Sequence, residues 1–264
     1  MSTVTNPAPL TLAGAQDHHQ VVPVTRETRP HVLIVVASPH EVAPGFVVGF
    51  WASELTHPYY EFSMARYRVT VASPRGGTVH LDGFSDPRDP SRWSADDLIS
   101  MGFLSTPELA ALLDSTARLA DLDLDQFDAL VVAGGMAPMF TFREDEAIKR
   151  AIKHFYEAQK PTAALCHGVA ALMDVTLADG RRLIEGKTIT GFANVEEDYG
   201  QRAMGSDHDL WPWRIEDTAR QLGANYVQAG RFRAFAVRDG RLITGQQQYS
   251  GAEVARLVVQ ALGV

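Results

Sequence analysis

The stretch Pro161-Thr-Ala-Ala-Leu-Cys-His-Gly-Val-Ala-Ala-Leu172 decides the fold of this chain, and it holds the only cysteine, Cys166. The apolar residues 162–165 predict a buried strand, and the small residues 168–172 predict the start of a helix. Cys166 and His167 stand between them, where a sharp strand-to-helix turn, a nucleophile elbow, exposes the turn residue. Because the helix N-terminus then points at the sulfur and favours a thiolate, we expect Cys166 to be largely ionised at neutral pH.

Further strands and helices alternate on both sides of this stretch. The apolar runs 31–37 and 128–133 predict buried parallel strands. Other strands are expected at 67–72, 187–191, 225–228, 234–237 and 242–244, and helices at 46–67, 107–119 (with Thr106 as N-cap and Pro107 first in the helix), 144–159, 211–222 and 250–262. This alternation predicts an α/β fold, a mostly parallel sheet with helices on both faces in the flavodoxin-like manner.

The domain organisation is simple. The chain has 264 residues, enough for one large α/β domain or two small ones, and no linker divides residues 30–264. Residues 1–29 are rich in Thr, Pro, Ala, Val and Gln without a clear period, so we expect a flexible or strapped-on extension there. His18-His19 lies in this extension, but two adjacent histidines without a third ligand are a weak indication of a metal site.

Composition excludes several classes of protein. With 45% hydrophobic and 21% charged residues the chain is typical of globular proteins. The net charge is -8 and no Lys/Arg cluster occurs, which argues against nucleic-acid binding. No apolar run approaches the roughly eighteen residues of a membrane span, and the start lacks the pattern of a secretory signal. A single cysteine forms no intramolecular disulfide, so we expect a cytoplasmic protein.

Three predicted strands end in residues that we expect to meet. The carboxyl ends of parallel strands share one edge of a sheet, where ligands bind, and Cys166, Gly134-Gly135 and the segment after Gly191 all follow strands. A cysteine nucleophile needs a lowered pKa, a proton-transfer partner and oxyanion donors. Backbone N–H groups of His167 and of the Gly134-Gly135 turn are candidate donors, although two glycines after a strand more often form a plain turn.

The histidines leave open questions. His167 directly follows Cys166, so its spacing fits equally a ring that acts on a bound substrate and a ring packed in the core. The remaining histidines of the chain body show no spacing typical of metal ligands: His31, His40, His57, His80, His154 and His208. We therefore expect neither a metal nor another cofactor.

Six blocks of sequence, in order between about residues 31 and 262, carry a resemblance. They are Glu54-Leu-Thr-His-Pro-Tyr-Tyr60, Ala72-Ser-Pro-Arg-Gly-Gly77, Val132-Ala-Gly-Gly135, Leu165-Cys-His-Gly168, Glu185-Gly-Lys-Thr-Ile-Thr-Gly-Phe192 with Glu196-Glu197, and Asp239-Gly-Arg-Leu-Ile-Thr-Gly-Gln246. Together they resemble the ThiJ/PfpI superfamily, which has the class I glutamine-amidotransferase-like fold. The most similar branch is the heat-shock chaperone and glyoxalase III type.

The resemblance implies roles for four residues. Cys166 matches the nucleophile and His167 the histidine beside it, while Glu54 matches a glutamate that hydrogen-bonds the sulfur and Glu197 an acidic residue that orients the histidine. Glu54 also faces inward from a predicted helix that is otherwise lined by Phe50, Leu55 and Tyr59, where burying a carboxyl without a purpose is costly. Glu197 belongs to an acidic run, 196–198, and such runs are usually solvated.

The resemblance also implies a reaction. Methylglyoxal becomes lactate without glutathione or a metal, the reaction of glyoxalase III or D-lactate dehydratase, a hydro-lyase. Cys166 attacks the aldehyde, a base (Glu54 or His167) moves a proton between the two carbons, and hydrolysis of a thioester releases the acid. The resemblance implies a homodimer that binds a small carbonyl compound, and the oxyanion or substrate contacts fall on Gly134, Gly135, Met136, Gly168 and Tyr249.

Two loops depart from the family pattern. Gly134-Gly-Met-Ala137 replaces the usual Gly-Gly-His-Gly, and Gly245-Gln-Gln-Gln-Tyr-Ser250 replaces Gly-Gln-Asn-Pro-Ala-Ser. Met136 makes the expected pocket more apolar, and Tyr249 adds bulk and a hydroxyl. The substrate is therefore open to a larger, less polar carbonyl, nitrile or isonitrile. The stretch 204–213, with two tryptophans, fits a core anchor better than a lid over the pocket.

Three functions remain in competition. The favoured one is a cofactor-independent glyoxalase III-like enzyme. The second is another cysteine-dependent hydrolase or hydratase, acting on an isonitrile or an amide, because one fold supports several chemistries. The third is a holdase chaperone or redox stress protein, because an exposed cysteine of low pKa oxidises readily.

Overall fold

A twisted, mostly parallel sheet forms the centre of the computed structural model, which describes residues 29–203, 205 and 211–263. Its strands are β1 (His31–Val35), β4 (Arg68–Ser73), β5 (Ala117–Arg118), β6 (Ala129–Val132), β7 (Thr162–Leu165), β10 (Ala236–Asp239) and β11 (Leu242–Gly245). The order across the seven-stranded sheet is β10-β11-β7-β6-β1-β4-β5. Its neighbouring strands pair in parallel except β10, which pairs antiparallel with β11. The predicted α/β fold is confirmed.

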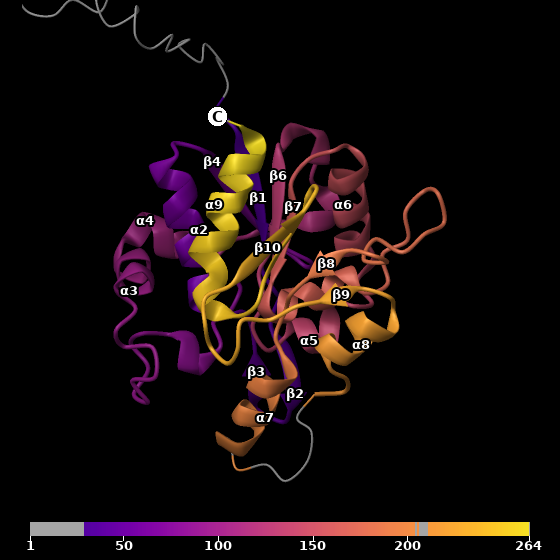
Figure 1. Ribbon diagram of the computed structural model, residues 1–264. Coiled ribbons are helices and arrows are strands. Elements are labelled where there is room, and N and C mark those ends of the chain that lie inside the picture. Colours follow the sequence, from indigo (N-terminus) through magenta and orange to yellow (C-terminus); the bar gives the residue numbers. More distant parts are fainter. Residues whose placement is uncertain (1–28, 204, 206–210, 264) are drawn as a thin grey trace, which may run out of the picture.

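Helices cover both faces of this sheet. α2 (Ala52–Met64) and α9 (Gly251–Leu262) lie side by side over one face, and α6 (Glu146–Glu157) packs against the other (Figure 1). The central strands β1, β6 and β7 are therefore buried on both sides, and their backbone hydrogen bonds are satisfied within the sheet. This double covering explains why they read as continuous apolar runs and not as alternating patterns.

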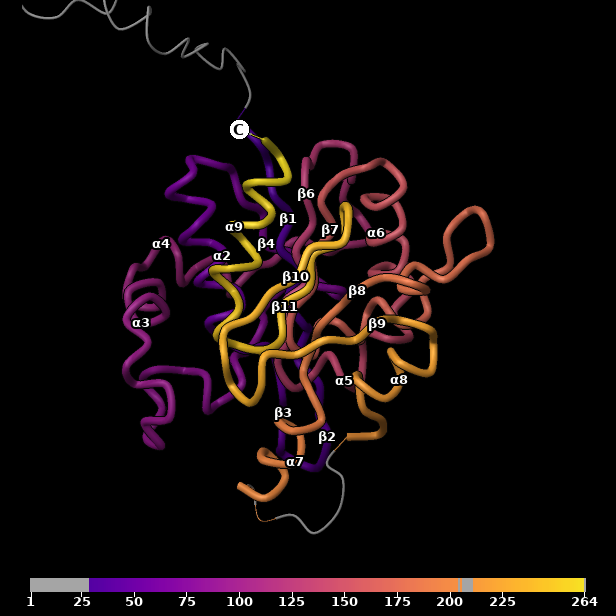
Figure 2. Tube along the Cα trace, in the orientation of Figure 1, coloured from indigo at the N-terminus to yellow at the C-terminus, as the bar shows by residue number. Residues whose placement is uncertain are grey.

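Smaller elements surround the sheet. They are the hairpin β2 (His40–Ala43) and β3 (Phe46–Val48), the pair β8 (Thr188–Ile189) and β9 (Asn225–Tyr226), and the helices α3 (Leu98–Ser105), α4 (Pro107–Ala110), α5 (Pro138–Thr141), α7 (Asn194–Ala203) and α8 (Ile215–Gln221). The hairpin and α7 lie beyond the carboxyl ends of the sheet strands (Figures 1 and 2). Within the described ranges, no helix has the length and apolarity that crossing a membrane requires.

The predicted helix at 46–67 is wrong in its first part. Residues 46–48 form β3 of the hairpin, which turns at Gly45 with a φ of 76°, and helix α2 begins only at Ala52. Phe46 and Val47 are 52% and 44% exposed, so their spacing never marked a buried helix face. The helical spacing of apolar residues that was traced back to Phe46 is therefore a coincidence in residues 46–48.

The predicted helix at 107–119 is also too long. Pro107 does occupy the first helical position, but the α-helical turn ends at Ala110 and residues 117–118 join the sheet as β5. The Thr106 hydroxyl does not cap this helix, because it donates a hydrogen bond to the carbonyl of Gly102 in α3. The predicted helix at 211–222 likewise begins only at Ile215.

Candidate active site

Cys166 sits at a strained turn between β7 and a short 3₁₀ helix, Cys166–Leu172. Leu165 is still extended, whereas Cys166 has a φ of 54°, in the left-handed region that side chains other than glycine rarely adopt. Such strain persists only where the surrounding structure enforces it, and it concentrates at functional sites. The strand-to-helix elbow predicted from the sequence is therefore present.

Two glycines allow the elbow to pack tightly against the end of β6. A Cβ on Gly168 would lie 2.6 Å from the carbonyl oxygen of Val132, and one on Gly134 would lie 2.7 Å from the backbone nitrogen of His167. Neither glycine lines the cavity at Cys166. Their part in the site is close backbone packing, so the predicted contact of Gly134 and Gly168 with a ligand is not what the geometry shows.

The Gly168→Ala variant is expected to lose about 1–3 kcal/mol of unfolding free energy, because the added methyl overlaps the backbone of β6. Urea denaturation measures this loss. Gly102→Ala is the matched control: Gly102 lies in helix α3, and a Cβ there meets no atom within 4 Å. Its unfolding free energy should stay equal or rise by up to about 1 kcal/mol. Equal stability of the two variants would contradict the packing role.

Glu54 from α2 is fully buried beside the cysteine. Its Oε2 accepts a hydrogen bond of 2.6 Å from the backbone N–H of Gly134, and its carboxyl interacts with the Cys166 thiol. Burial raises the pKa of Glu54 to about 8, and its hydrogen-bond partners offset only part of that rise. The carboxyl therefore carries a proton in most molecules at neutral pH and exchanges it near that pH.

The cysteine itself differs from the sequence-based expectation. Burial raises the pKa of the Cys166 thiol well above its ordinary value, and the neighbouring Glu54 raises it further. Backbone N–H groups of His167 and Gly135 donate toward the sulfur and lower this pKa, but by less. The expected resting thiolate is therefore wrong, because the prediction counted the helix terminus and not the buried carboxyl.

Titration of the thiolate absorbance checks this point. We expect a wild-type midpoint above the roughly 8.5 of a free cysteine, with the Cys166→Ala protein as the blank. Glu54→Gln removes the negative charge beside the sulfur, so its midpoint should be lower than that of the wild type. A wild-type midpoint below about 7, or an unchanged midpoint in the Gln variant, would contradict the coupling of the two groups.

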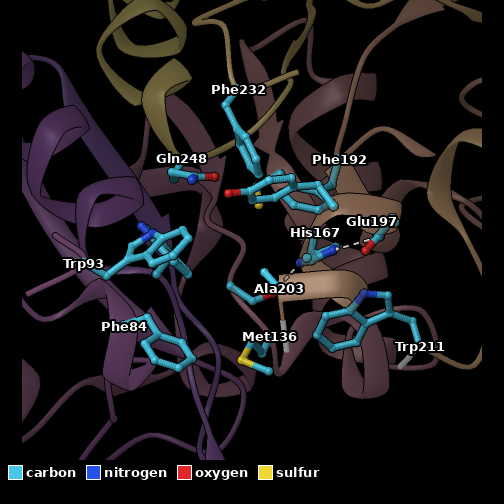
Figure 3. Close-up of a pocket in the computed structure, with 15 residues that line it drawn as sticks. Phe84, Trp93, Met136, His167, Phe192, Glu197, Ala203, Trp211, Phe232 and Gln248 are labelled. Atoms are coloured by element: carbon cyan, nitrogen blue, oxygen red, sulfur yellow. Dashed lines mark hydrogen bonds and ion pairs between the residues drawn. The ribbon is translucent and has the colours of Figure 1, made fainter. Parts of the chain in front are cut away.

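His167 is held at both ring nitrogens. Nδ1 lies 3.0 Å from the carbonyl oxygen of Gly135, and Nε2 lies 3.1 Å from Oε1 of Glu197 (Figure 3). Burial lowers the pKa of His167, but the Glu197 carboxylate outweighs it and the pKa is raised. Both partners are acceptors, so the doubly protonated imidazolium satisfies them together. The ring packs against Phe192 and Trp211, with centroid distances of 4.3 and 5.0 Å.

The acidic run 196–198 is not a solvated face. Glu197 and Glu196 are both buried on α7, and Asp198 pairs with Arg214 at 2.7 Å. Glu196 accepts hydrogen bonds from the backbone N–H groups of Ala193 and Phe232 and from the side-chain amide of Gln246. These hydrogen bonds connect α7 to the segment that contains Phe232 and to Gln246, directly after β11. The usual interpretation of such a run fails because α7 turns its first two carboxylates inward.

Asp82 is a buried carboxylate that the sequence did not single out. It accepts hydrogen bonds from the backbone N–H groups of Gly49 and Met136, at 2.8 and 2.7 Å. It thereby holds the turn that follows β6, whose Gly135 N–H points at Cys166. Over residues 29–203, 205 and 211–263, no group of three His, Cys, Asp or Glu side chains has the arrangement of a metal site.

A cavity of about 250 Å³ opens above Cys166 and His167 (Figure 3). Its other lining residues are Trp51, Phe84, Trp93, Gly135, Met136, Phe192, Glu197, Tyr199, Gly200, Ala203, Trp211, Phe232 and Gln248. Gly135 and Met136 thus line the cavity, where the sequence analysis expected contacts with the substrate. Tyr249 does not: it is 53% exposed and lines a neighbouring cavity, while Gln248 takes part in both.

Both tryptophans of this stretch, Trp211 and Trp213, are half-buried. Trp213 packs against the core and lies under the guanidinium of Arg143, 4.6 Å from it. Trp211 packs against the core too, but it also forms part of the cavity wall. Met204 and residues 206–210 of the same stretch, the extension up to residue 28, and His18-His19 within it lie outside the described residues.

Known proteins share this architecture. The family model described as "DJ-1/PfpI family" matches residues 46–261. Glyoxalase 3 of Candida albicans is 27% identical over 235 residues, which cover 87% of this chain and 97% of the relative. Glutathione-independent glyoxalase HSP31 of Saccharomyces cerevisiae is 26% identical over 247 residues, covering 88% and 97%.

Solved structures agree with these sequence relatives. The crystal structure of glyoxalase III from Candida albicans superimposes with a TM-score of 0.74 at 27% identity, covering 88% of this chain and 97% of that one. Rapid Encystment Protein 24 KDa of Francisella tularensis gives 0.79 at 29% identity, covering 88% and 99%. The resemblance seen in six sequence blocks is confirmed, and the chain belongs to the DJ-1/PfpI family.

Proposed function

We propose that this protein is a cofactor-independent enzyme that converts an α-oxoaldehyde to the corresponding 2-hydroxy acid, in the manner of a glutathione-independent glyoxalase. The observation that carries the proposal is the pairing of Cys166, which lines the cavity, with Glu54, which is buried beside its thiol. The pKa of Glu54 is about 8, near neutral pH, and a side chain accepts and returns protons most effectively when its pKa lies near the pH at which it acts. Names of the relatives point to the same activity.

The first step is attack on the aldehyde carbon. The ionised fraction of Glu54 accepts the thiol proton as the sulfur of Cys166 bonds to carbon, so no resting thiolate is required. Glu54 then passes this proton to the aldehyde oxygen, which becomes the hydroxyl of a hemithioacetal, and Glu54 is ionised again for the next step. The backbone N–H groups of Gly135 and His167, which donate toward the sulfur, are the proposed donors to the charge on that oxygen during attack.

The second step moves hydrogen between the two carbons. Glu54 removes the proton from the former aldehyde carbon, and the resulting enediol regains a proton at the neighbouring carbon. The product is the Cys166 thioester of a 2-hydroxy acid. Water then hydrolyses the thioester, which releases the acid and restores the thiol. Overall one water is added and no oxidant or reductant is consumed.

His167 is better suited to a supporting part than to that of the base. Both ring nitrogens already donate to acceptors, Gly135 and Glu197, so neither offers a free lone pair. Its positive charge lies near Glu54 and favours the ionised carboxylate. Of the two bases that the sequence left open, the geometry favours Glu54.

A substrate panel without glutathione tests the proposal. We expect α-oxoaldehydes to yield 2-hydroxy acids, identified by NMR, and a chelator such as EDTA to leave the rate unchanged. The panel includes isonitriles and amides, because a buried cysteine beside a carboxyl serves hydration or hydrolysis too. Formation of a formamide from an isonitrile, or of an acid from an amide, with no 2-hydroxy acid from any oxoaldehyde, would replace this proposal with the hydrolase or hydratase alternative.

A further inference from the structure

The walls of the cavity above Cys166 are almost entirely apolar. Trp93 and Phe84 form one side, Phe192, Phe232 and Trp211 face them, and Met136 lies below (Figure 3). Polar side chains are few: Cys166, His167 and Glu197 at the catalytic end, Gln248, and Tyr199 with its hydroxyl. A substrate in this cavity must therefore place its carbonyl groups at Cys166 and an apolar body against the aromatic rings.

The size of the cavity exceeds the needs of a methyl group. A cavity of roughly 150 Å³ lined by apolar side chains holds a benzene molecule and stays dry when empty. About 250 Å³ is available here, which accommodates one ring and the dicarbonyl group attached to it. With methylglyoxal most of the apolar wall would face either empty space or poorly bonded water, and its contacts would be lost.

The wall opposite Trp93 is held in place. The Phe232 N–H donates a 2.8 Å hydrogen bond to buried Glu196, and the Phe232 ring lies edge-on to Tyr199 and Phe192 at 5.4 and 6.4 Å. Phe192 in turn packs on His167 at 4.3 Å. Because these rings are fixed by packing and hydrogen bonds, the cavity cannot close down around a small substrate at no cost.

We propose that the preferred substrate is an α-oxoaldehyde with an aryl substituent, or an alkyl group of similar bulk, and that methylglyoxal is a poor one. The inference rests on the proposed function and adds the substrate class to it. Phenylglyoxal represents the class, and mandelate is then the product in place of lactate. The aromatic ring would lie between the side formed by Phe84 and Trp93 and the opposing rings of Phe192 and Phe232.

The test compares kcat/KM for phenylglyoxal and methylglyoxal with the wild-type protein. We expect phenylglyoxal to be favoured at least about tenfold, the discrimination typical of a hydrophobic pocket. The Cys166→Ala protein serves as the blank and removes the contribution of phenylglyoxal reacting with arginine side chains. Mandelate should also inhibit at a concentration at least about tenfold lower than lactate.

The outcomes separate the two proposals. Equal or faster turnover of methylglyoxal would overturn the inference and leave the proposed function intact. No 2-hydroxy acid from either compound would overturn the proposed function. In that event, tighter binding of mandelate than of lactate would still support the aryl-binding cavity, and equal binding would refute it too.

A matched pair of variants assigns the preference to the cavity wall. Phe84 lines the cavity and is 48% exposed, whereas Phe46 is 52% exposed and is not among the lining residues. Phe84→Ala should lower kcat/KM for phenylglyoxal about tenfold and leave methylglyoxal within about twofold, while Phe46→Ala changes neither. Equal effects of the two variants on the phenylglyoxal rate would count against the inference.

A variant that fills part of the cavity gives the complementary result. Gly200 on α7 lines the cavity, and a Cβ added there meets no atom within 4 Å. Gly200→Leu is expected to fold and to narrow the cavity, so that phenylglyoxal turnover falls about tenfold and methylglyoxal turnover stays within about twofold. If both rates fell alike, the substituent would not occupy this space.

Discussion

The Cys166→Ala variant is expected to lose at least about 10⁴-fold in turnover of every α-oxoaldehyde, because the covalent route disappears with the sulfur. Folding should persist. The buried side chain is small, and alanine meets the same left-handed backbone strain that Cys166 already bears, so the unfolding free energy should change by only about 1 kcal/mol. Steady-state kinetics, with circular dichroism and urea denaturation of the same samples, measures both quantities.

A second measurement identifies the chemical role of the sulfur. Rapid quenching of wild-type protein with substrate should show a mass increase equal to one substrate molecule on the peptide that contains Cys166, and the alanine variant should show none. Turnover above about a tenth of the wild-type rate in Cys166→Ala would end the claim of a covalent nucleophile, since loss of an essential nucleophile costs orders of magnitude.

Glu54→Gln is expected to reduce kcat about 10²–10⁴-fold, the usual contribution of a positioned acid or base. Glutamine preserves the shape, and its side-chain oxygen still accepts the N–H of Gly134, so the site should stay assembled. Glu61→Gln is the control on the same helix. Glu61 is half-buried and pairs with Arg256 near the surface, so its substitution should leave kcat within about twofold. Unaltered kcat in Glu54→Gln would remove that carboxyl from the mechanism.

Glu54→Gln should also change how stability depends on pH. The folded-state pKa of Glu54, about 8, lies above its ordinary value of 4.5, so the folded protein holds this proton more tightly than the unfolded chain does. The stabilisation that this difference in pKa provides is complete below pH 4.5 and is lost as the pH rises through about 8. Urea titrations between about pH 5 and 8 should show a smaller decline in unfolding free energy for the variant than for the wild type.

The local sequence was sufficient to predict a structural element where one residue pattern was unambiguous. The runs 31–37, 128–133 and 162–165 are apolar throughout because the central strands are buried on both faces, and that pattern does not depend on the rest of the chain. The elbow at Cys166 was visible because a strand signal and a helix signal meet there with two residues between them. Glu54 was noticeable as a carboxyl on the apolar face of a predicted helix.

Other features arise only from tertiary structure. Phe84 and Trp93 come from one segment and Phe232 from another that is far away in the chain, and no local period marks them as walls of one cavity. The burial of Glu196 and Glu197 depends on where α7 docks. The pKa of Cys166 is governed by burial and by Glu54, a residue more than a hundred positions away, whereas the sequence offered only the neighbouring helix terminus. Asp82 was missed for the same reason.

The hydrogen bonds of Glu196 have a consequence for protein engineering and for evolution. Its neighbour Glu197 orients His167, while Glu196 itself fixes the backbone of Phe232. Mutations in the segments that contain Glu196 and Phe232 would therefore disturb both the orientation of His167 and the cavity wall proposed to select the substrate. Phe84 and Trp93 belong to a separate segment and contact each other, so a library directed at them offers new specificities at less risk to the reaction.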